Sequence, residues 1–154
     1  MSNDGGINAL RGFRKQFLHT LQRIVTAKNG ECFYPEGVED IDVYDSNAQL
    51  LERVQVKDYK DPLTKGDIDT FLKRSIVIAE ENKEVTFVLA SYGELGPELG
   101  QLIEFDEKTI KKPKFKNYQK VLQRFHFKKL DEQNELAVIK NFLANIPMLG
   151  RVIK

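Results

Sequence analysis

The amino-acid sequence predicts an α/β fold in which a mixed β-sheet is flanked by helices. Segments with apolar residues three or four apart, typical of helices, alternate with shorter segments of period two, typical of strands. Two strand-type segments form a hairpin pattern within residues 40–57, and a strand–helix–strand pattern over 53–90 predicts a right-handed crossover. With 154 residues and 41% hydrophobic content, the chain can bury one core. We therefore expect a flexible lead-in at 1–7 and a single domain at 8–154.

The first third of the chain predicts a helix followed by a hairpin. Residues 8–28 form an amphipathic helix pattern, and Asn29 with Gly30 ends it. Polar and apolar residues then alternate over 40–44 and again over 53–57, with short polar turn residues between, so an antiparallel pair of strands is expected. The apolar face of the first helix consists of Leu10, Phe13, Phe17, Leu21 and Ile24.

The middle of the chain predicts the crossover helix and a central strand. Residues 65–82 have helical spacing, and Thr64 is a suitable cap for the helix. Residues 85–90 form a nearly continuous apolar run, as expected of a strand in the middle of a covered sheet. The predicted buried side of the helix consists of Ile68, Phe71, Leu72, Ser75, Ile76 and Ala79.

The last third predicts three further elements after a glycine-rich segment. Residues 93–100 lack the Gly-Lys-Ser/Thr ending of a phosphate-binding loop and predict a turn into a short helix. A basic helix is expected around 117–124, a strand at 125–128 and a final helix at 131–146. The predicted inward residues of that final helix are Leu136, Ile139, Leu143 and Ile146.

Charges are unevenly distributed although the net charge is only +1. Nine basic residues and no acidic one lie within 108–129, whereas six acidic residues and no basic one lie within 31–45. A compact acidic cluster in a chain with a basic arm suits a metal site that holds a phosphodiester. The alternative interpretation of the basic arm alone is a solvated surface.

The sequence also argues against several protein classes. It contains no run of about 18 apolar residues, the length typical of a membrane span. The first residues lack the basic and apolar regions of a secretion signal. The single cysteine, Cys32, forms neither an internal disulfide nor a zinc cluster. We expect a cytoplasmic protein that does not act at a membrane.

A constellation of polar residues on the predicted hairpin indicates phosphodiester chemistry. Because strand side chains alternate in direction, Gln55 and Lys57 share one face of their strand, and Asp40 and Asp42 share one face of theirs. Carboxylate oxygens are the ligands that Mg²⁺ prefers, and Mn²⁺ is a plausible substitute. The Gln55 amide and the Val56 carbonyl offer further oxygen atoms, while the lysine can position water or stabilise negative charge.

Three segments carry a resemblance to a known family: GFRKQF (12–17), EGVEDIDVYD (36–45) and VQVKDYK (54–60). Over roughly residues 8–100, the chain resembles the PD-(D/E)xK nuclease superfamily in its D…QxK variant. It is similar to the double-stranded DNA endonuclease effectors of CBASS and related bacterial antiphage systems, and more distantly to Mrr-like restriction nucleases. The resemblance implies a restriction-endonuclease-like sheet. The family's functional residues then fall on Asp42 or Asp40 as metal ligand, Gln55, Lys57, Gln16 on the first helix and, more weakly, Glu36.

The expected activity is therefore Mg²⁺-dependent hydrolysis of double-stranded DNA with little sequence specificity, as an antiviral defence effector. Two alternatives stay open: a catalytically inert nucleic-acid-binding or oligomerisation module, and a hydrolase of RNA or another phosphodiester. Cutting both strands requires two sites, so we expect a homo-oligomer. A sensor domain or protein outside this chain is also expected. The predicted DNA-backbone contacts are Arg11, Arg14, Lys15, Lys60, Lys112, Lys114 and Lys116.

Overall fold

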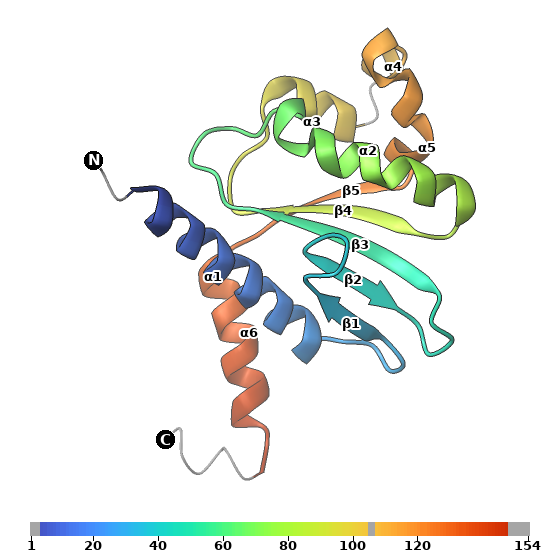
Figure 1. Cartoon of the computed structure of the whole chain (residues 1–154). Coiled ribbons are helices and arrows are strands. Elements are labelled where there is room, and N and C mark those ends of the chain that lie inside the picture. Colours follow the sequence, from blue (N-terminus) through green and yellow to red (C-terminus); the bar gives the residue numbers. More distant parts are fainter. Residues whose placement is uncertain (1–3, 105–106, 148–154) are drawn as a thin grey trace.

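The computed structural model describes residues 4–104 and 107–147 and confirms an α/β fold. One five-stranded mixed sheet lies between two groups of helices (Figure 1). The first three strands are antiparallel neighbours, and the last three are parallel neighbours. In order across the sheet, the strands are β1 (Cys32–Pro35), β2 (Ile41–Tyr44), β3 (Leu50–Lys57), β4 (Thr86–Ser91) and β5 (Phe125–Lys129).

The predicted hairpin is formed by β2 and β3, and an additional strand, β1, extends it. Ile41 is paired with Val54 and Asp42 with Arg53, so the register follows the expected antiparallel pattern. Strand β1 was not predicted, because its four residues are mostly exposed and lack polar–apolar alternation. It ends at Pro35, which an edge strand tolerates because one side of its backbone is unpaired.

The crossover helix α2 (Lys65–Glu81) joins β3 to its parallel neighbour β4, as predicted. At its start, the backbone N–H and hydroxyl of Thr64 both donate to the Asp67 carboxylate, at 2.8 and 2.7 Å. Five of the six predicted inward residues are buried, and Ile76 is partly buried. The main core therefore lies between this helix and the sheet, where the rings of Phe71 and Phe87 meet edge to face.

The segment that connects β4 to β5 forms several short helices. The first follows the glycine-rich turn as predicted, whereas the basic helix predicted around 117–124 is replaced by two shorter helices over 113–122. Pro113 opens the third of the short helices, and Phe115 and Tyr118 are buried in the main core. The segment lies on the α2 side of the sheet (Figure 1), and its lysines are exposed. The short helices are α3 (Pro97–Ile103), α4 (Glu107–Ile110), η1 (Pro113–Tyr118) and α5 (Gln119–Leu122).

The opposite face of the sheet is covered by α1 (Asp4–Val25) and α6 (Glu132–Ala144) (Figure 1). Helix α1 begins four residues before its predicted start at residue 8. Both helices differ from the predicted inward faces. The apolar face of α1 points into solvent, and in α6 the prediction for Leu136 is wrong, because that side chain is 39% exposed. Ile139, Leu143 and Ile146 are only partly buried.

A buried polar network explains this inversion of α1 and α6. The imidazole of His19, 1% exposed, lies 2.6 Å from the Glu135 carboxylate, which also accepts a hydrogen bond from the Tyr92 hydroxyl. The Lys15 ammonium pairs with Glu132 and lies 4.3 Å from the centre of the Tyr92 ring. Burial and the hydrogen bond to Glu135 raise the pKa of the tyrosine hydroxyl. Paired charges thus hold these two helices together, and hydrophobic periodicity does not detect such contacts.

None of the helices in the described part of the chain is both long enough and apolar enough to cross a membrane.

Candidate active site

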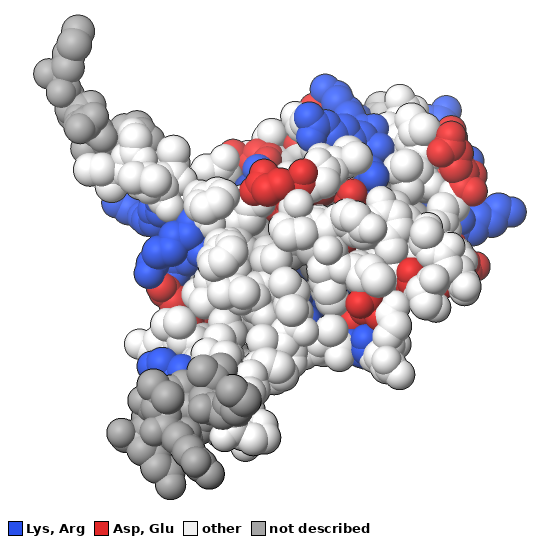
Figure 2. Space-filling view, turned by 60° about the horizontal axis from the view of Figure 1, so that its bottom comes forward, with Lys and Arg blue, Asp and Glu red and all other residues white. Residues whose placement is uncertain are grey.

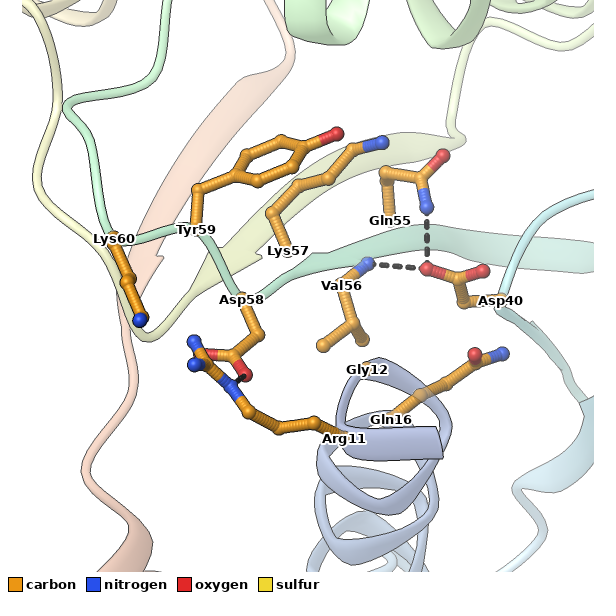
Figure 3. A pocket seen from close by; sticks show the side chains of 10 residues that line it. All are labelled: Arg11, Gly12, Gln16, Asp40, Gln55, Val56, Lys57, Asp58, Tyr59 and Lys60. Atoms are coloured by element: carbon orange, nitrogen blue, oxygen red, sulfur yellow. Dashed lines mark hydrogen bonds and ion pairs between the residues drawn. The ribbon is translucent and has the colours of Figure 1, made fainter. Parts of the chain in front are cut away.

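A pocket of about 440 Å³ opens between α1, the loop before β2 and the carboxyl end of β3 (Figure 3). Five residues predicted from sequence to act together line it. They are joined by basic, acidic and aromatic residues that follow β3 or lie on α1. The lining consists of Arg11, Gly12, Gln16, Asp40, Gln55, Val56, Lys57, Asp58, Tyr59 and Lys60.

Asp40 reaches this pocket because it lies just before β2, where the pairing with β3 ends at Ile41 and Val54. Its carboxylate accepts the backbone N–H of Val56 at 2.6 Å and a hydrogen bond from the Gln55 amide (Figure 3). If β2 continued, a backbone carbonyl of β2 would accept the Val56 N–H; the Asp40 carboxylate takes that place. Burial raises the pKa of this carboxyl, while the two hydrogen bonds and the positive charge of Lys57 act in the opposite direction.

Strand β3 supplies Gln55 and Lys57 from one face, as period-two alternation predicts. In Figure 3 both side chains project away from α1, and Val56 projects toward it. The Lys57 ammonium lies 5.8 Å from the centre of the Tyr59 ring. Within residues 4–104 and 107–147, no carboxylate forms a salt bridge with Lys57. Its charge is therefore left to act on Asp40 and on whatever enters the pocket.

Gln16 lines the pocket, and Glu36 lies behind it. The Gln16 amide donates to the Glu36 carboxylate at 2.6 Å, which ties α1 to the turn between β1 and β2. Glu36 does not line the pocket, but its negative charge contributes to the raised pKa of Asp40. Glu36 has a φ of 55°, in the left-handed region that non-glycine residues seldom adopt. The Glu36 carboxylate thus adds negative potential near Asp40 from outside the pocket lining.

Asp42 does not join this group, which corrects the expectation that both aspartates share one patch. Its side chain is almost fully buried, with one oxygen 3.2 Å from the Nε atom of Arg53 and the other 3.3 Å from the Val38 N–H. It lies on β2 opposite Arg53, whereas Asp40 precedes the strand and escapes its alternation. The sequence left the two aspartates unranked, and the structure places Asp40 in the pocket.

The residues present fit a divalent cation with oxygen ligands. Asp40 supplies a carboxylate, Gln55 an amide oxygen and Val56 a backbone carbonyl, all from the lining of one pocket. In this structure the glutamine presents its nitrogen to Asp40, and rotation of the amide presents the oxygen instead. Among the described residues there is no group of three or more His, Cys, Asp or Glu suited to a metal. The donor set therefore holds one carboxylate with neutral oxygens and leaves positions for water and phosphate.

The predicted DNA contacts on α1 are mostly engaged within the protein. Arg11 pairs with Asp58 at 2.6 Å, and Arg14 pairs with Glu132 at 2.8 Å while remaining largely exposed. Lys15 is buried and pairs with the same glutamate, so this structure does not present it to solvent.

Lys60 is exposed and lines the pocket, whereas no residue of the 108–129 arm does. Lys112, Lys114 and Lys116 do not line the pocket, and Lys114 pairs with Glu98. Figure 2 shows the basic residues of one face in separate groups at its margins, divided by a mostly uncharged surface. A continuous basic stripe is therefore absent from the face shown.

No protein-family model matches the sequence, and no curated protein is similar to it. The structure is similar to that of the Moraxella osloensis Cap4 SAVED/CARF-domain containing receptor, with a TM-score of 0.53 and 18% identity. The match covers 93% of this chain and 38% of the receptor chain. The comparison therefore supports the fold and shows that the chain spans well under half of that protein's length.

Proposed function

We propose that this chain is a metal-dependent endonuclease domain that hydrolyses phosphodiester bonds of double-stranded DNA. The observation that carries the proposal is the meeting of Asp40, Gln55, Val56 and Lys57 in one open pocket. Gln55, Val56 and Lys57 come from β3 and Asp40 from the loop before β2, and each has a chemically distinct role.

Asp40, the Gln55 amide oxygen and the Val56 carbonyl would hold Mg²⁺ or Mn²⁺. When bound, such an ion polarises the phosphoryl oxygen and lowers the pKa of its water. The Lys57 ammonium, free of carboxylate partners in the described chain, stabilises the negative charge that develops on the phosphate. The Val56 N–H and Gln55 fix the orientation of the Asp40 carboxylate before substrate arrives.

Two further features support the biological setting that we propose, an antiviral defence effector within a larger protein. The three antiparallel strands followed by a crossover to parallel strands agree with the restriction-endonuclease-like sheet implied by the sequence resemblance. The fold neighbour is described as a SAVED/CARF-domain containing receptor, and this chain matches 38% of it. The sheet topology and the partial match to a receptor both agree with a nuclease domain that a receptor partner or domain activates.

The alternative of an inert module has one observation in its favour: of the two carboxylates that line the pocket, Asp58 pairs with Arg11, which leaves Asp40 as the one carboxylate of the proposed donor set. A plasmid-cleavage assay separates the two functions. We expect Mg²⁺-dependent nicking or linearisation by the parent chain, abolished by chelation.

Lys57→Ala should reduce the cleavage rate by at least about a hundredfold, because the charge-stabilising group is lost. Lys83→Ala, an exposed lysine after α2, is the matched control and should cleave like the parent. Equal cleavage by the Lys57 variant removes that residue from the mechanism. Binding of DNA without cleavage at any metal concentration supports the inert module. Preferential degradation of RNA supports the alternative of a hydrolase that acts on RNA.

A further inference from the structure

A second pocket lies on the α1 side of the sheet, apart from the candidate active site. Its volume is about 180 Å³, and none of the described residues lines both pockets. The two valines of its lining are buried, and the other side chains are charged or titratable. This pocket, which we call the β5 pocket, is lined by His19 and Arg23 of α1, Glu52 and Val54 of β3, Val88 of β4, and His126 and Lys128 of β5.

Alternation along β5 places two of its polar side chains in this pocket. The phenylalanines of the strand pack toward the main core on the α2 side, so His126 and Lys128 point to the opposite side of the sheet. Arg23 follows His19 by one helical turn, so both extend from the same face of α1. Four side chains that carry N–H donors therefore converge on one small space.

Several of these nitrogen atoms have no partner among the described residues. Lys128 is partly buried and forms neither a salt bridge nor a hydrogen bond with them. Arg23 donates from one terminal nitrogen to Glu52 at 2.7 Å, and its other terminal nitrogen is not engaged. His19 is 1% exposed, and its Nδ1 atom lies 2.6 Å from Glu135, while its Nε2 atom is not engaged. An acceptor that entered the pocket would satisfy such donors.

Positive charge in the β5 pocket exceeds negative charge. Arg23 and Lys128 are cations, and Glu52 is the one carboxylate among the described lining residues. Burial lowers the pKa of Lys128, and the charge of Arg23 lowers it further, while Glu135 and Glu52 act in the opposite direction. The two cations thus lie close enough to repel each other, and a bound anion would relieve that repulsion.

The size and the chemistry of the pocket favour a small oxyanion. Pockets for drug-sized ligands and cofactors measure about 300–1,000 Å³, so this pocket is too small for a whole nucleotide. Arginine and lysine are the side chains that recognise phosphate in proteins, and imidazole nitrogens supply further donors. We propose that the β5 pocket binds a single phosphate group between Lys128, Arg23 and the two histidines. This site does not rest on the proposed nuclease activity, and its test needs no cleavage.

Calorimetric titration of the whole chain with inorganic phosphate tests the site, with ionic strength held constant by chloride so that screening stays fixed. Lys128→Met should raise the dissociation constant at least about tenfold, because it removes a charge-assisted hydrogen bond and keeps the length of the side chain. Lys129→Met is the matched control, because this neighbouring lysine does not line the pocket and pairs with Glu94. It should bind phosphate like the parent. A parent chain that binds no phosphate at millimolar concentration, or equal weakening by both variants, overturns the proposal.

Glu52→Gln should have the opposite effect on phosphate binding. The substitution removes the negative charge of the pocket, while the amide oxygen can still accept a hydrogen bond from Arg23. We expect a lower dissociation constant for phosphate than in the parent. Circular dichroism should show the helix content of the parent in this variant and in Lys128→Met. A folded Glu52→Gln chain that binds phosphate no better than the parent contradicts the proposed role of charge in the pocket.

The lysine variants also identify the source of the phosphate group. A labelled DNA duplex presents phosphodiesters, whereas inorganic phosphate is the free ion. Duplex binding that is weakened in Lys128→Met and unchanged in Lys129→Met assigns the site to the nucleic-acid backbone. Equal duplex binding by both variants, together with the loss of phosphate affinity in Lys128→Met, assigns the site to free phosphate or a small phosphate ester.

Discussion

At the scale of single residues, the site depends on a difference between two aspartates only two positions apart. Asp40 lies before β2 and turns its carboxylate to the backbone of β3, while Asp42 lies within β2 and pairs with Arg53. Alternation along a strand predicted that Gln55 and Lys57 share a face. It failed for Asp40 and Asp42 because the strand begins between them, and strand boundaries depend on pairing partners that a local pattern does not contain.

Asp40→Asn should stabilise the metal-free chain at neutral pH. Burial raises the pKa of Asp40 in the folded state, so the stability that its proton contributes is present below the unfolded pKa and is lost as pH rises through the folded pKa. The asparagine carries no charge and avoids this loss. Thermal melting should show the variant above the parent at pH 7, with the difference vanishing in acid; a variant that melts lower at pH 7 contradicts the pKa direction.

Arg53→Leu should destabilise the fold. Both side chains of the Asp42–Arg53 pair are less than a tenth exposed, burial raises the pKa of Asp42, and removal of Arg53 leaves that buried carboxylate without its counter-charge. We expect a loss of about 3 kcal/mol in the free energy of unfolding. Urea denaturation measures this change, and an unaltered midpoint would show that the ion pair contributes nothing to the fold.

At the scale of elements, the sequence predicted the main helices but missed strand β1 and the face through which α1 attaches. Helix α2 has its expected inward residues because its apolar face meets the main core. Strand β1 is exposed and lacks a pattern, and α1 is attached through His19 and Lys15 rather than through its apolar face. Charged partners on α6 are distant in sequence, so no local window reveals them.

Asp67→Ala should destabilise the start of α2. The Asp67 carboxylate accepts hydrogen bonds from both the backbone N–H and the hydroxyl of Thr64, which lower the pKa of that carboxyl. Loss of this cap should cost about 1 kcal/mol, or about 3 °C in melting temperature for a domain of this size. Glu84→Ala, an exposed carboxylate beyond the helix, is the control and should melt like the parent.

The pH dependence of this cap has a defined sign. Because the folded pKa of Asp67 is lowered, its contribution is present above the unfolded pKa and is lost as pH falls through the folded pKa. The parent and Asp67→Ala melting curves should therefore converge in acid. Parallel curves down to the lowest pH would assign the stability difference to another cause.

At the scale of the whole molecule, charge distribution along the chain was a poor guide to charge distribution on the surface. The 108–129 arm is basic in sequence, but it does not form one basic surface: Lys114 and Lys120 pair with glutamates on the α2 side of the sheet, whereas Lys128 lines a pocket with His19 and Arg23 of α1. Lys60, a single basic residue after β3, lies at the pocket edge. The order of elements along the sequence was enough to predict the α/β class and the crossover. The positions of charges on the surface could be read only from the folded structure.

Lys60→Ala should therefore weaken DNA binding more than Lys116→Ala does. Loss of one phosphate contact should reduce the slope of log affinity against log salt by about 1 for Lys60, and Lys116→Ala should leave the slope unchanged. Fluorescence anisotropy with a labelled duplex at several salt concentrations measures both slopes. A larger change for Lys116 would place the DNA on the α2 side of the molecule.

Calorimetric titration with Mn²⁺ tests the proposed site most directly. The parent chain and Lys57→Ala should bind the ion with equal stoichiometry, because Lys57 is not a ligand in this account. Asp40→Asn should weaken binding by at least about tenfold, since it removes the one carboxylate of the donor set. Unchanged Mn²⁺ binding by Asp40→Asn would contradict the assignment of this pocket as the metal centre.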